Sequence, residues 1–112
     1  MFMPGKPQIW YLDLFAGKND HEAVQRAGES GHKEINRTNL SVDQIAEGLK
    51  KDVVQKQLAL IRMRNTHKAF SEGAEVTISG EESSLEIRWE YDGAYAELHV
   101  NFEEGTYTIE SN

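Results

Sequence analysis

The sequence predicts an α+β fold in which helices precede a small antiparallel β-sheet that packs on a helix. Apolar residues recur at helical spacing from Val53 to about Asn65, whereas beyond Phe70 they alternate with polar residues. The dipeptide Asp92-Gly93 separates two alternating segments and is a strong signal for a two-residue hairpin. An amphipathic helix and a sheet with one apolar face must each bury that face against another element, which predicts that they pack together.

Composition and charge narrow the class of protein. The chain of 112 residues has a net charge of −7 and contains no Cys. Eleven basic and eight acidic residues occur up to Ser71, but one basic and eleven acidic residues follow from Glu72 onward. This change in charge predicts a boundary between two parts of the chain after Ser71. The acidic balance argues against nucleic acid or an anionic membrane as a partner, and no apolar run approaches the ~20 residues of a membrane span. The lack of Cys fits a reducing compartment, so we expect a soluble, cytoplasmic protein.

A short apolar run near the N-terminus predicts a buried strand. Residues Ile9 to Phe15 are apolar except for Asp13, do not alternate, and lie between Pro7 and Gly17. Such runs are typical of strands that are covered on both faces inside parallel sheets. Parallel neighbours need crossovers of about a dozen residues or more, and too few residues precede Ile9 to supply one. We therefore expect its neighbouring strands to lie outside this sequence.

Helix caps mark two further segments. Asp20 is a suitable N-cap for a short helix over residues 21–27, and residues 29–40 have no sustained period, which predicts a loop. Ser41 and Gln44 have the spacing of a capping box, so a second helix should begin directly after Ser41.

The second half of the chain predicts an antiparallel meander. A first strand is expected at residues 75–79. A second turn at Glu104-Gly105 places Phe102 opposite Tyr107 and Val100 opposite Ile109. The hairpin at Asp92-Gly93 sets the central register and puts every apolar residue on one face. The paired residues are Leu85 and Val100, Ile87 and Leu98, Trp89 and Ala96, and Tyr91 and Ala94.

Chemical motifs are few. Asp13, Asp20 and Glu22 are candidates for paired carboxylates in acid–base chemistry, but roles at a strand end and in helix capping explain them better. The His residues lack a ligand spacing such as HExxH, and no phosphate loop, GxSxG elbow or Cys nucleophile occurs. We therefore expect neither a metal nor a cofactor.

One resemblance goes further than these motifs. Residues 2–20 contain Pro4-Gly5-x-Pro7-Gln8-Ile9-x-Tyr11-x-Asp13-Leu14-x-Ala16-Gly17-x-Asn19-Asp20, which resembles the eighth barrel strand and following loop of sucrose phosphorylases in the α-amylase superfamily. The similarity continues, in the same order, to about residue 71. Its further motifs are Glu34-Ile35-Asn36-Arg37, Val53-Val54 and Ile61-Arg62-x-Arg64-Asn65-Thr66-His67-x-Ala69-Phe70. The later strands are similar only in pattern to the small antiparallel domain that ends those enzymes.

The resemblance implies a fold and an activity. Residues 1–71 would be the end of a catalytic (β/α)8 barrel, with its last strand, loop and terminal helices, and residues 72–112 would be the C-terminal antiparallel β-domain. Enzymes of this family transfer a glucosyl group between a sugar acceptor and phosphate with retention, using a carboxylate nucleophile, a Glu acid/base and a third carboxylate. In the family pattern all three precede the region that this chain resembles, so no catalytic residue is assigned.

The resemblance also implies substrate-binding residues. Arg37 matches the family Arg that, together with an upstream Asp, binds the glucosyl unit of the donor. A guanidinium suits this role because its planar donors hold a carboxylate and sugar hydroxyls in one geometry. Asn36 would support Arg37. Asp13 is a further candidate because it lies at the C-terminal end of the expected barrel strand, where barrel active sites are found.

Three functions follow as hypotheses. The first is the C-terminal part of a sucrose-phosphorylase-like glucosyltransferase, inactive by itself because the catalytic carboxylates are absent; its sugar substrate would bind only in the full enzyme. The second is a non-catalytic interaction module that associates through residues 8–14 or a sheet edge. A homodimer would be the observation that identifies it. The third is a small carbohydrate-binding domain that uses Trp89, Tyr91 or Tyr95.

Overall fold

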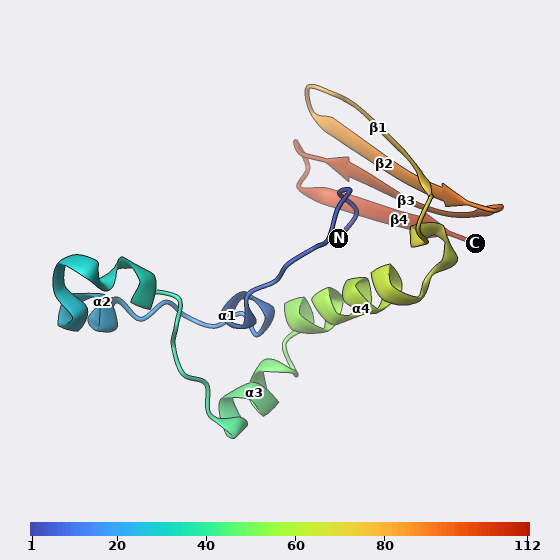
Figure 1. The fold of residues 1–112 in the computed structure, drawn as a ribbon. Coiled ribbons are helices and arrows are strands. Elements are labelled where there is room, and N and C mark those ends of the chain that lie inside the picture. Colours follow the sequence, from blue (N-terminus) through green and yellow to red (C-terminus); the bar gives the residue numbers. More distant parts are fainter. The chain divides into compact units, whose positions relative to one another are not determined.

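The computed structural model describes the backbone of residues 1–112 and every side chain except that of Ser30. The chain forms two compact units, one made of Met1–Pro7 with Leu60–Asn112 and the other of Gln8–Ala59. We call them the sheet unit and the helical unit (Figure 1). Among the described residues, no helix combines the length and the apolar character that crossing a membrane requires.

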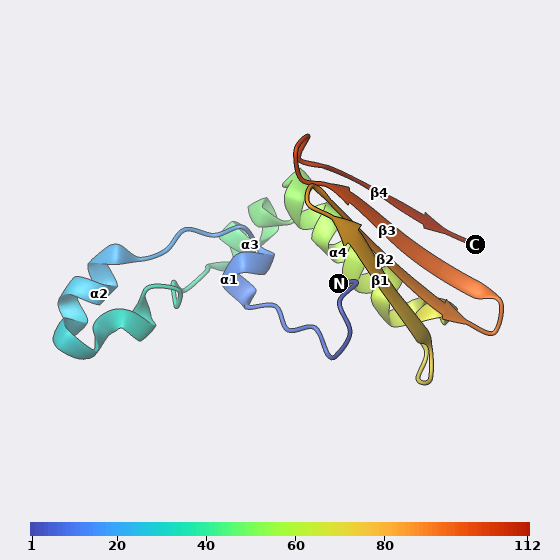
Figure 2. The same cartoon turned by 90° about the horizontal axis from the view of Figure 1, so that it is seen from above.

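The sheet unit contains a four-stranded antiparallel meander, as the alternating pattern predicts. The strands lie side by side in chain order, β1-β2-β3-β4, which Figure 2 shows from above. They are β1 (Glu75–Glu81), β2 (Ser84–Tyr91), β3 (Ala94–Asn101) and β4 (Thr106–Ser111). Leu60 and Met63, in the last part of helix α4 (Asp52–Thr66), pack against the core of this sheet. The predicted packing of the sheet on a helix is therefore confirmed.

The register of β2 and β3 is confirmed throughout. Trp89 lies opposite Ala96, and Arg88 lies opposite Glu97 on the other face. At the turn, Asp92 has φ 46° and Gly93 has φ 76°. Both values are positive, as a type I′ turn requires, and Asp and Gly tolerate them better than other residues.

The register of β3 and β4 differs from the prediction by two residues. Val100 lies opposite Tyr107, not Ile109, because the connection is a four-residue loop over residues 102–105 and not a two-residue turn. The Asn101 side chain shapes this loop by accepting a hydrogen bond from the backbone N–H of Glu104 at 3.0 Å. Because the shift is an even number of residues, the apolar residues of β4 stay on the predicted face.

The hairpin between β2 and β3 carries an ion pair whose effect depends on pH. The Lys68 ammonium donates a hydrogen bond to the Asp92 carboxylate and lowers the pKa of Asp92 from its ordinary value. With a lowered folded-state pKa, the pair stabilises the folded chain above the ordinary Asp pKa of ~3.9 and loses this effect as the pH falls through the lowered value. Asp92→Asn removes the charge but tolerates the positive φ.

We therefore expect wild type to have the higher urea midpoint at pH 7, and the difference from Asp92→Asn to shrink as the pH falls below about 3.9. Urea unfolding followed by tryptophan fluorescence at several pH values measures this difference. A difference that stays constant down to pH ~2 would contradict the assigned pair.

The core of the sheet unit includes the start of the chain. Its buried residues are Phe2, Ala69, Ile87, Trp89 and Ala96. The Trp89 indole N–H donates to the backbone carbonyl of Phe2, and the Phe2 ring packs edge-on against Phe70 with ring centroids 5.4 Å apart. Arg64 of α4 donates to the carbonyl of Gly5 at 3.1 Å. Met1–Pro7 is therefore a structural part of the sheet unit, although Phe2 and Trp89 are 87 positions apart in the chain.

Phe2→Ala should lower the free energy of unfolding by about 3 kcal/mol, because Phe2 is only 4% exposed and its removal leaves a cavity beside Trp89. The neighbouring Met3→Ala is the matched control. Met3 is 59% exposed, so its loss should change stability by no more than ~0.5 kcal/mol. Urea unfolding of the two variants measures both effects, and equal effects would contradict the placement of Phe2 in the core.

The helical unit confirms both predicted caps. Asp20 accepts a hydrogen bond from the backbone N–H of Ala23 at 2.8 Å, and Ser41 and Gln44 form the reciprocal capping box. The helices are α1 (Tyr11–Leu14), α2 (His21–Ala27), the 3-10 helix η1 (Gly28–Glu34), α3 (Val42–Gly48) and the first part of α4. Because η1 fills the first part of residues 29–40, the prediction of a loop over that whole range is wrong. In the described part of this unit, the buried hydrophobic side chains are Leu12 and Val54.

The prediction of a strand over Ile9–Phe15 is also wrong for this chain. Residues 11–14 form the helical turn α1, in which the N–H of Leu14 donates to the carbonyl of Trp10 at 2.9 Å. A buried parallel strand depends on neighbours for its backbone hydrogen bonds, and the described residues supply none at this position. A helical turn satisfies these groups locally. No barrel strand is therefore present in the described chain.

Candidate functional site

The predicted binding residues Asn36 and Arg37 lie in the segment that follows η1. The Arg37 side chain is 52% exposed and forms one ion pair, with Glu34, at 3.3 Å. Its backbone N–H donates to the Glu34 carbonyl at 3.1 Å, which holds the residue at the end of the turn. The guanidinium has five N–H donors, so most of them remain accessible to a ligand.

Two aromatic residues hold the segment that carries Arg37. The Trp10 indole N–H donates to the Asn36 carbonyl at 2.6 Å, and the Tyr11 hydroxyl donates to the Thr38 carbonyl at 2.9 Å. The two rings lie against each other with centroids 5.1 Å apart. Trp10 and Tyr11 therefore fix the backbone on either side of Arg37. No local sequence pattern predicts this role, although the polar group of a Trp or Tyr side chain usually finds a hydrogen-bond partner.

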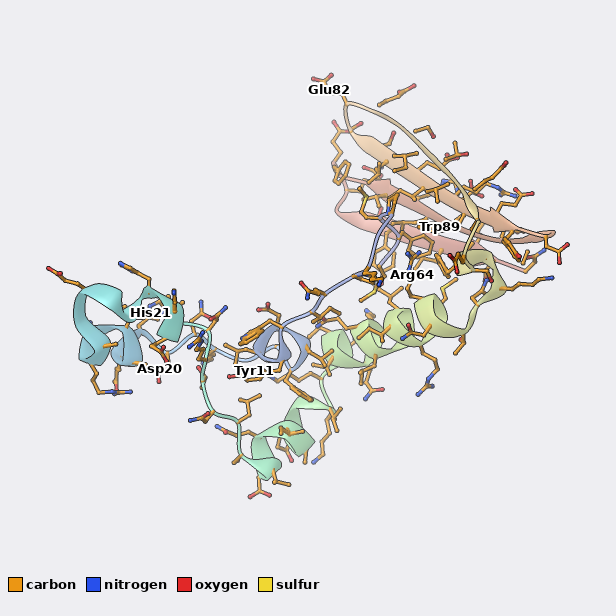
Figure 3. All side chains as sticks on the ribbon, viewed as in Figure 1. Tyr11, Asp20, His21, Arg64, Glu82 and Trp89 are labelled. Carbon is orange, nitrogen blue, oxygen red and sulfur yellow. The ribbon has the colours of Figure 1, made fainter. Side chains whose placement is uncertain are left out.

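The loop after α1 contacts the same segment. The Thr38 hydroxyl donates to the Lys18 carbonyl at 2.9 Å, and the Asp20 N–H donates to the Ile35 carbonyl at 2.8 Å. These contacts place a polar hollow of about 370 Å³ beside Thr38. It is lined by Lys18, Asn19, Asp20, His21, Glu22 and Thr38. Figure 3 labels Tyr11, Asp20 and His21 on this unit.

Asp13 is not part of this arrangement. It lies in α1 with an exposed side chain, and its backbone carbonyl accepts a hydrogen bond from Gln57 at 3.3 Å. Among the described contacts, none joins its carboxylate to Asn36 or Arg37. The structure therefore brings Asn36 and Arg37 together with Trp10, but it gives Asp13 no shared contact with them.

The acidic residues beside the hollow have structural roles. Asp20 caps α2 and lies 3.6 Å from Arg26, and Glu22 lies 3.5 Å from the same guanidinium. Both carboxylates are thus paired with a cation on α2, which fits helix capping and not acid–base catalysis. Among the described residues of this site, these contacts leave no carboxylate pair set for glycosyl transfer.

A group of charged side chains on the outer face of the sheet has the composition of a metal site. Candidate ligand atoms of Glu86, Glu97 and His99 lie within 4.8 Å of one another. However, Arg88 pairs with Glu97 at 3.0 Å and with Glu90 at 3.2 Å. Burial acts to lower the pKa of Arg88, but its hydrogen bonds to these two carboxylates raise it overall. Since the Arg88 guanidinium already pairs with Glu97, one of the three candidate ligands, we assign no metal site to this group.

Of the aromatic residues proposed for carbohydrate binding, Trp89 and Tyr95 have ring contacts within the sheet unit, whereas Tyr91 is 36% exposed. Trp89 is 7% exposed, and the Arg64 guanidinium lies 4.0 Å from its ring centroid. On the outer face, Arg88 covers the Tyr95 ring at 4.4 Å. Trp89 therefore has no free face on which a sugar could stack, which argues against the third hypothesis.

Comparison with known proteins gives consistent relatives, although no protein-family model matches the chain. It is 47% identical over 109 residues to a sucrose 6(F)-phosphate phosphorylase of Ilumatobacter coccineus, a match that covers 97% of this chain and 21% of the relative. It is 35% identical over 100 residues to a glucosylglycerol phosphorylase of Marinobacter adhaerens, covering 89% of this chain and 20% of the relative.

A solved structure agrees with these relatives. The crystal structure of sucrose 6F-phosphate phosphorylase from Thermoanaerobacter thermosaccharolyticum superimposes with a TM-score of 0.87 at 37% identity, and the match covers 98% of this chain and 22% of that one. The chain thus spans about a fifth of the length of the curated relatives that it matches.

Proposed function

Because this chain belongs to the sucrose phosphorylase family and corresponds to its C-terminal part, we propose that it works as that part of a glucosyl-transferring phosphorylase. Such an enzyme transfers a glucosyl group between a glucoside and phosphate. The proposal gives this chain a role in substrate binding and in completing the fold of the enzyme. It assigns the bond-making chemistry to carboxylates that the chain does not contain.

The observation that carries the proposal is the extent of the match. At 47% identity, the similarity to the Ilumatobacter enzyme covers 97% of this chain and so includes both units. A TM-score of 0.87 over 98% of the chain supports the same fold for both. Interaction modules need to retain only a binding surface. Because the helical unit and the sheet unit are both similar to the enzyme, the match favours a role as part of a phosphorylase over a role as an interaction module.

Within this role, Arg37 is the residue that contacts the donor sugar. Its guanidinium is half-exposed, while its backbone is fixed through the contacts of Trp10 and Tyr11 with its neighbours in the chain. An accessible planar donor group on a fixed backbone is suited to hold sugar hydroxyls and a carboxylate together. Asn36 supports this geometry through its backbone carbonyl. Asp13 remains a weaker candidate for the same site.

A chimera tests the proposal. In it, the matched C-terminal region of the Ilumatobacter sucrose 6(F)-phosphate phosphorylase is replaced by this chain, and transfer of the glucosyl group to phosphate is assayed with sucrose 6F-phosphate as the donor. We expect the chimera to be active and the isolated chain to show no turnover. Phosphorolysis of a glucoside by the isolated chain would show that the proposed division of roles is wrong.

The alternative function is an interaction module that pairs through residues 8–14 or a sheet edge. The observation that favours it is the free edge of β1 and of β4 within the described sheet, since unpaired edges recruit further strands. Light scattering combined with amide hydrogen exchange separates the two functions. A dimer with protected amides in residues 8–14 or at an edge strand supports the module, whereas a monomer without such protection supports the enzyme part.

A further inference from the structure

One end of the apolar sheet face is left uncovered within the sheet unit. Ile87, Trp89 and Ala96 are buried beneath α4 and the N-terminal segment. By contrast, the exposed fractions of Phe102 and Tyr107 are 60% and 52%. Both lie toward the end of the sheet where β3 leads into β4. Large apolar side chains gathered in this way mark a surface that binds another part of a protein.

These side chains line a groove. The sheet-end groove has a volume of about 380 Å³, and its lining is mainly apolar. Its lining includes Phe2 and, from α4, Leu60. The lining residues from the sheet include Leu98, Val100, Tyr107 and Ile109. The groove thus continues the core of the unit outward, so an apolar side chain inserted there would extend a packed core.

Negative charge surrounds this end of the sheet. Ser84 pairs with Asn101, and Asn101 pairs with Thr106, so the β1–β2 and β3–β4 turns lie at the same end. These turns and the adjoining end of β1 contain Glu81, Glu82, Glu103 and Glu104. Glu82 is labelled at the tip of one turn in Figure 3. No Lys or Arg follows Arg88 in the sequence. In a symmetric dimer through this end, a second copy would bring the same charges to the groove, which disfavours that form of self-association.

We propose that the sheet-end groove is the docking surface for the N-terminal part of the phosphorylase, which contributes an apolar patch with a basic or neutral border. This inference rests on the proposed function. It is supported by length, because the relatives carry about four-fifths of their residues outside the matched region. It is also supported by charge, because a basic or neutral border complements the four Glu residues, whereas the same end of an identical copy does not.

Cysteine accessibility tests the inference, since the chain has no Cys of its own. Tyr107→Cys and Phe102→Cys are each made in the isolated chain and in the active chimera, and their rates of maleimide labelling are followed by mass spectrometry of the modified peptide. Thr108→Cys is the matched control, because Thr108 neighbours Tyr107 on β4 but points to the opposite face. Circular dichroism confirms that each variant is folded.

We expect Tyr107→Cys and Phe102→Cys to label about tenfold or more slowly in the chimera than in the isolated chain, while Thr108→Cys labels equally fast in both. The inference would be overturned if Tyr107→Cys labelled equally fast in the isolated chain and in an active chimera. It would also be overturned if the chimera slowed the labelling of Thr108→Cys as much as that of Tyr107→Cys. Either result would leave the proposed function intact. Slow labelling of a dimeric isolated chain would assign the groove to a second copy and also overturn it. A chimera that is inactive before any substitution would overturn the proposed function itself.

Discussion

Replacement of Trp89 by Ala is expected to lower the free energy of unfolding of the sheet unit by about 3–5 kcal/mol, which is a large part of the stability of a small domain. Trp89 is central to the core because it is 7% exposed and packs against Phe70 with ring centroids 5.4 Å apart. Its indole N–H also holds the Phe2 carbonyl. Urea unfolding followed by far-ultraviolet circular dichroism measures the loss without depending on Trp89 fluorescence.

Trp89→Phe is the matched control. It keeps an aromatic ring beside Phe70 but loses the hydrogen bond to Phe2, so it should cost only about 1–3 kcal/mol. The Arg64 guanidinium that lies over the ring adds to the effect of the Ala variant. Burial lowers the pKa of Arg64, and its Nη1 is buried with no hydrogen-bond partner among the described residues. This side chain therefore depends on its aromatic contacts together with the hydrogen bond to Gly5. A cost below ~1 kcal/mol for Trp89→Ala would contradict the central place of Trp89 in the core.

Replacement of Arg37 by Ala in the chimera is expected to reduce kcat/KM by about 10²-fold or more, as is typical when a positioned donor to the reacting substrate is removed. Arg37→Lys should not restore the activity, because an ammonium cannot reproduce the planar fork of a guanidinium. Initial rates of glucosyl transfer at low donor concentration measure the change. The isolated chain is of no use for this test because no turnover is expected from it.

Arg26→Ala serves as the matched control for Arg37. Arg26 is also an exposed Arg of the helical unit, and its ion-pair partners are Asp20 and Glu22 on its own helix segment. Its removal should leave kcat/KM within about threefold of the parent chimera, since exposed pairs of this kind contribute little. Similar losses for Arg26→Ala and Arg37→Ala would contradict the specific role of Arg37 in donor binding.

The parts of the fold that the sequence predicts are those fixed by local chemistry. The β2–β3 register follows from the Asp92-Gly93 turn and the alternation on either side of it, and the structure confirms both. The caps at Asp20 and Ser41 depend on groups within three residues of each other, and both are present.

The parts that the sequence does not predict depend on distant residues. Burial of Phe2 depends on Trp89, and no local pattern near Met1 signals this contact. The apolar run at residues 9–15 has the composition of a parallel strand, but a strand also needs neighbours, and without them the chain forms α1. The β3–β4 loop is longer than predicted because the Asn101 side chain stabilises a four-residue connection.

The candidate site is predictable in part. Arg37 and Asn36 follow from the family resemblance, and the structure places them on one fixed segment. The anchoring by Trp10 and Tyr11 could not be predicted because it joins residues 26 and 27 positions apart. The choice of Asp13 rests on a barrel strand expected to end there; the residue lies in α1 instead, and its role in binding stays a prediction.

The rate of glucosyl transfer to phosphate by the chimera tests the central claim most directly, because it asks whether this chain can serve as the C-terminal part of a phosphorylase. The claim predicts a kcat/KM within about tenfold of that of the intact Ilumatobacter enzyme with sucrose 6F-phosphate. A chimera that has the mass and circular dichroism of a folded enzyme but transfers glucose no faster than a buffer control would contradict it.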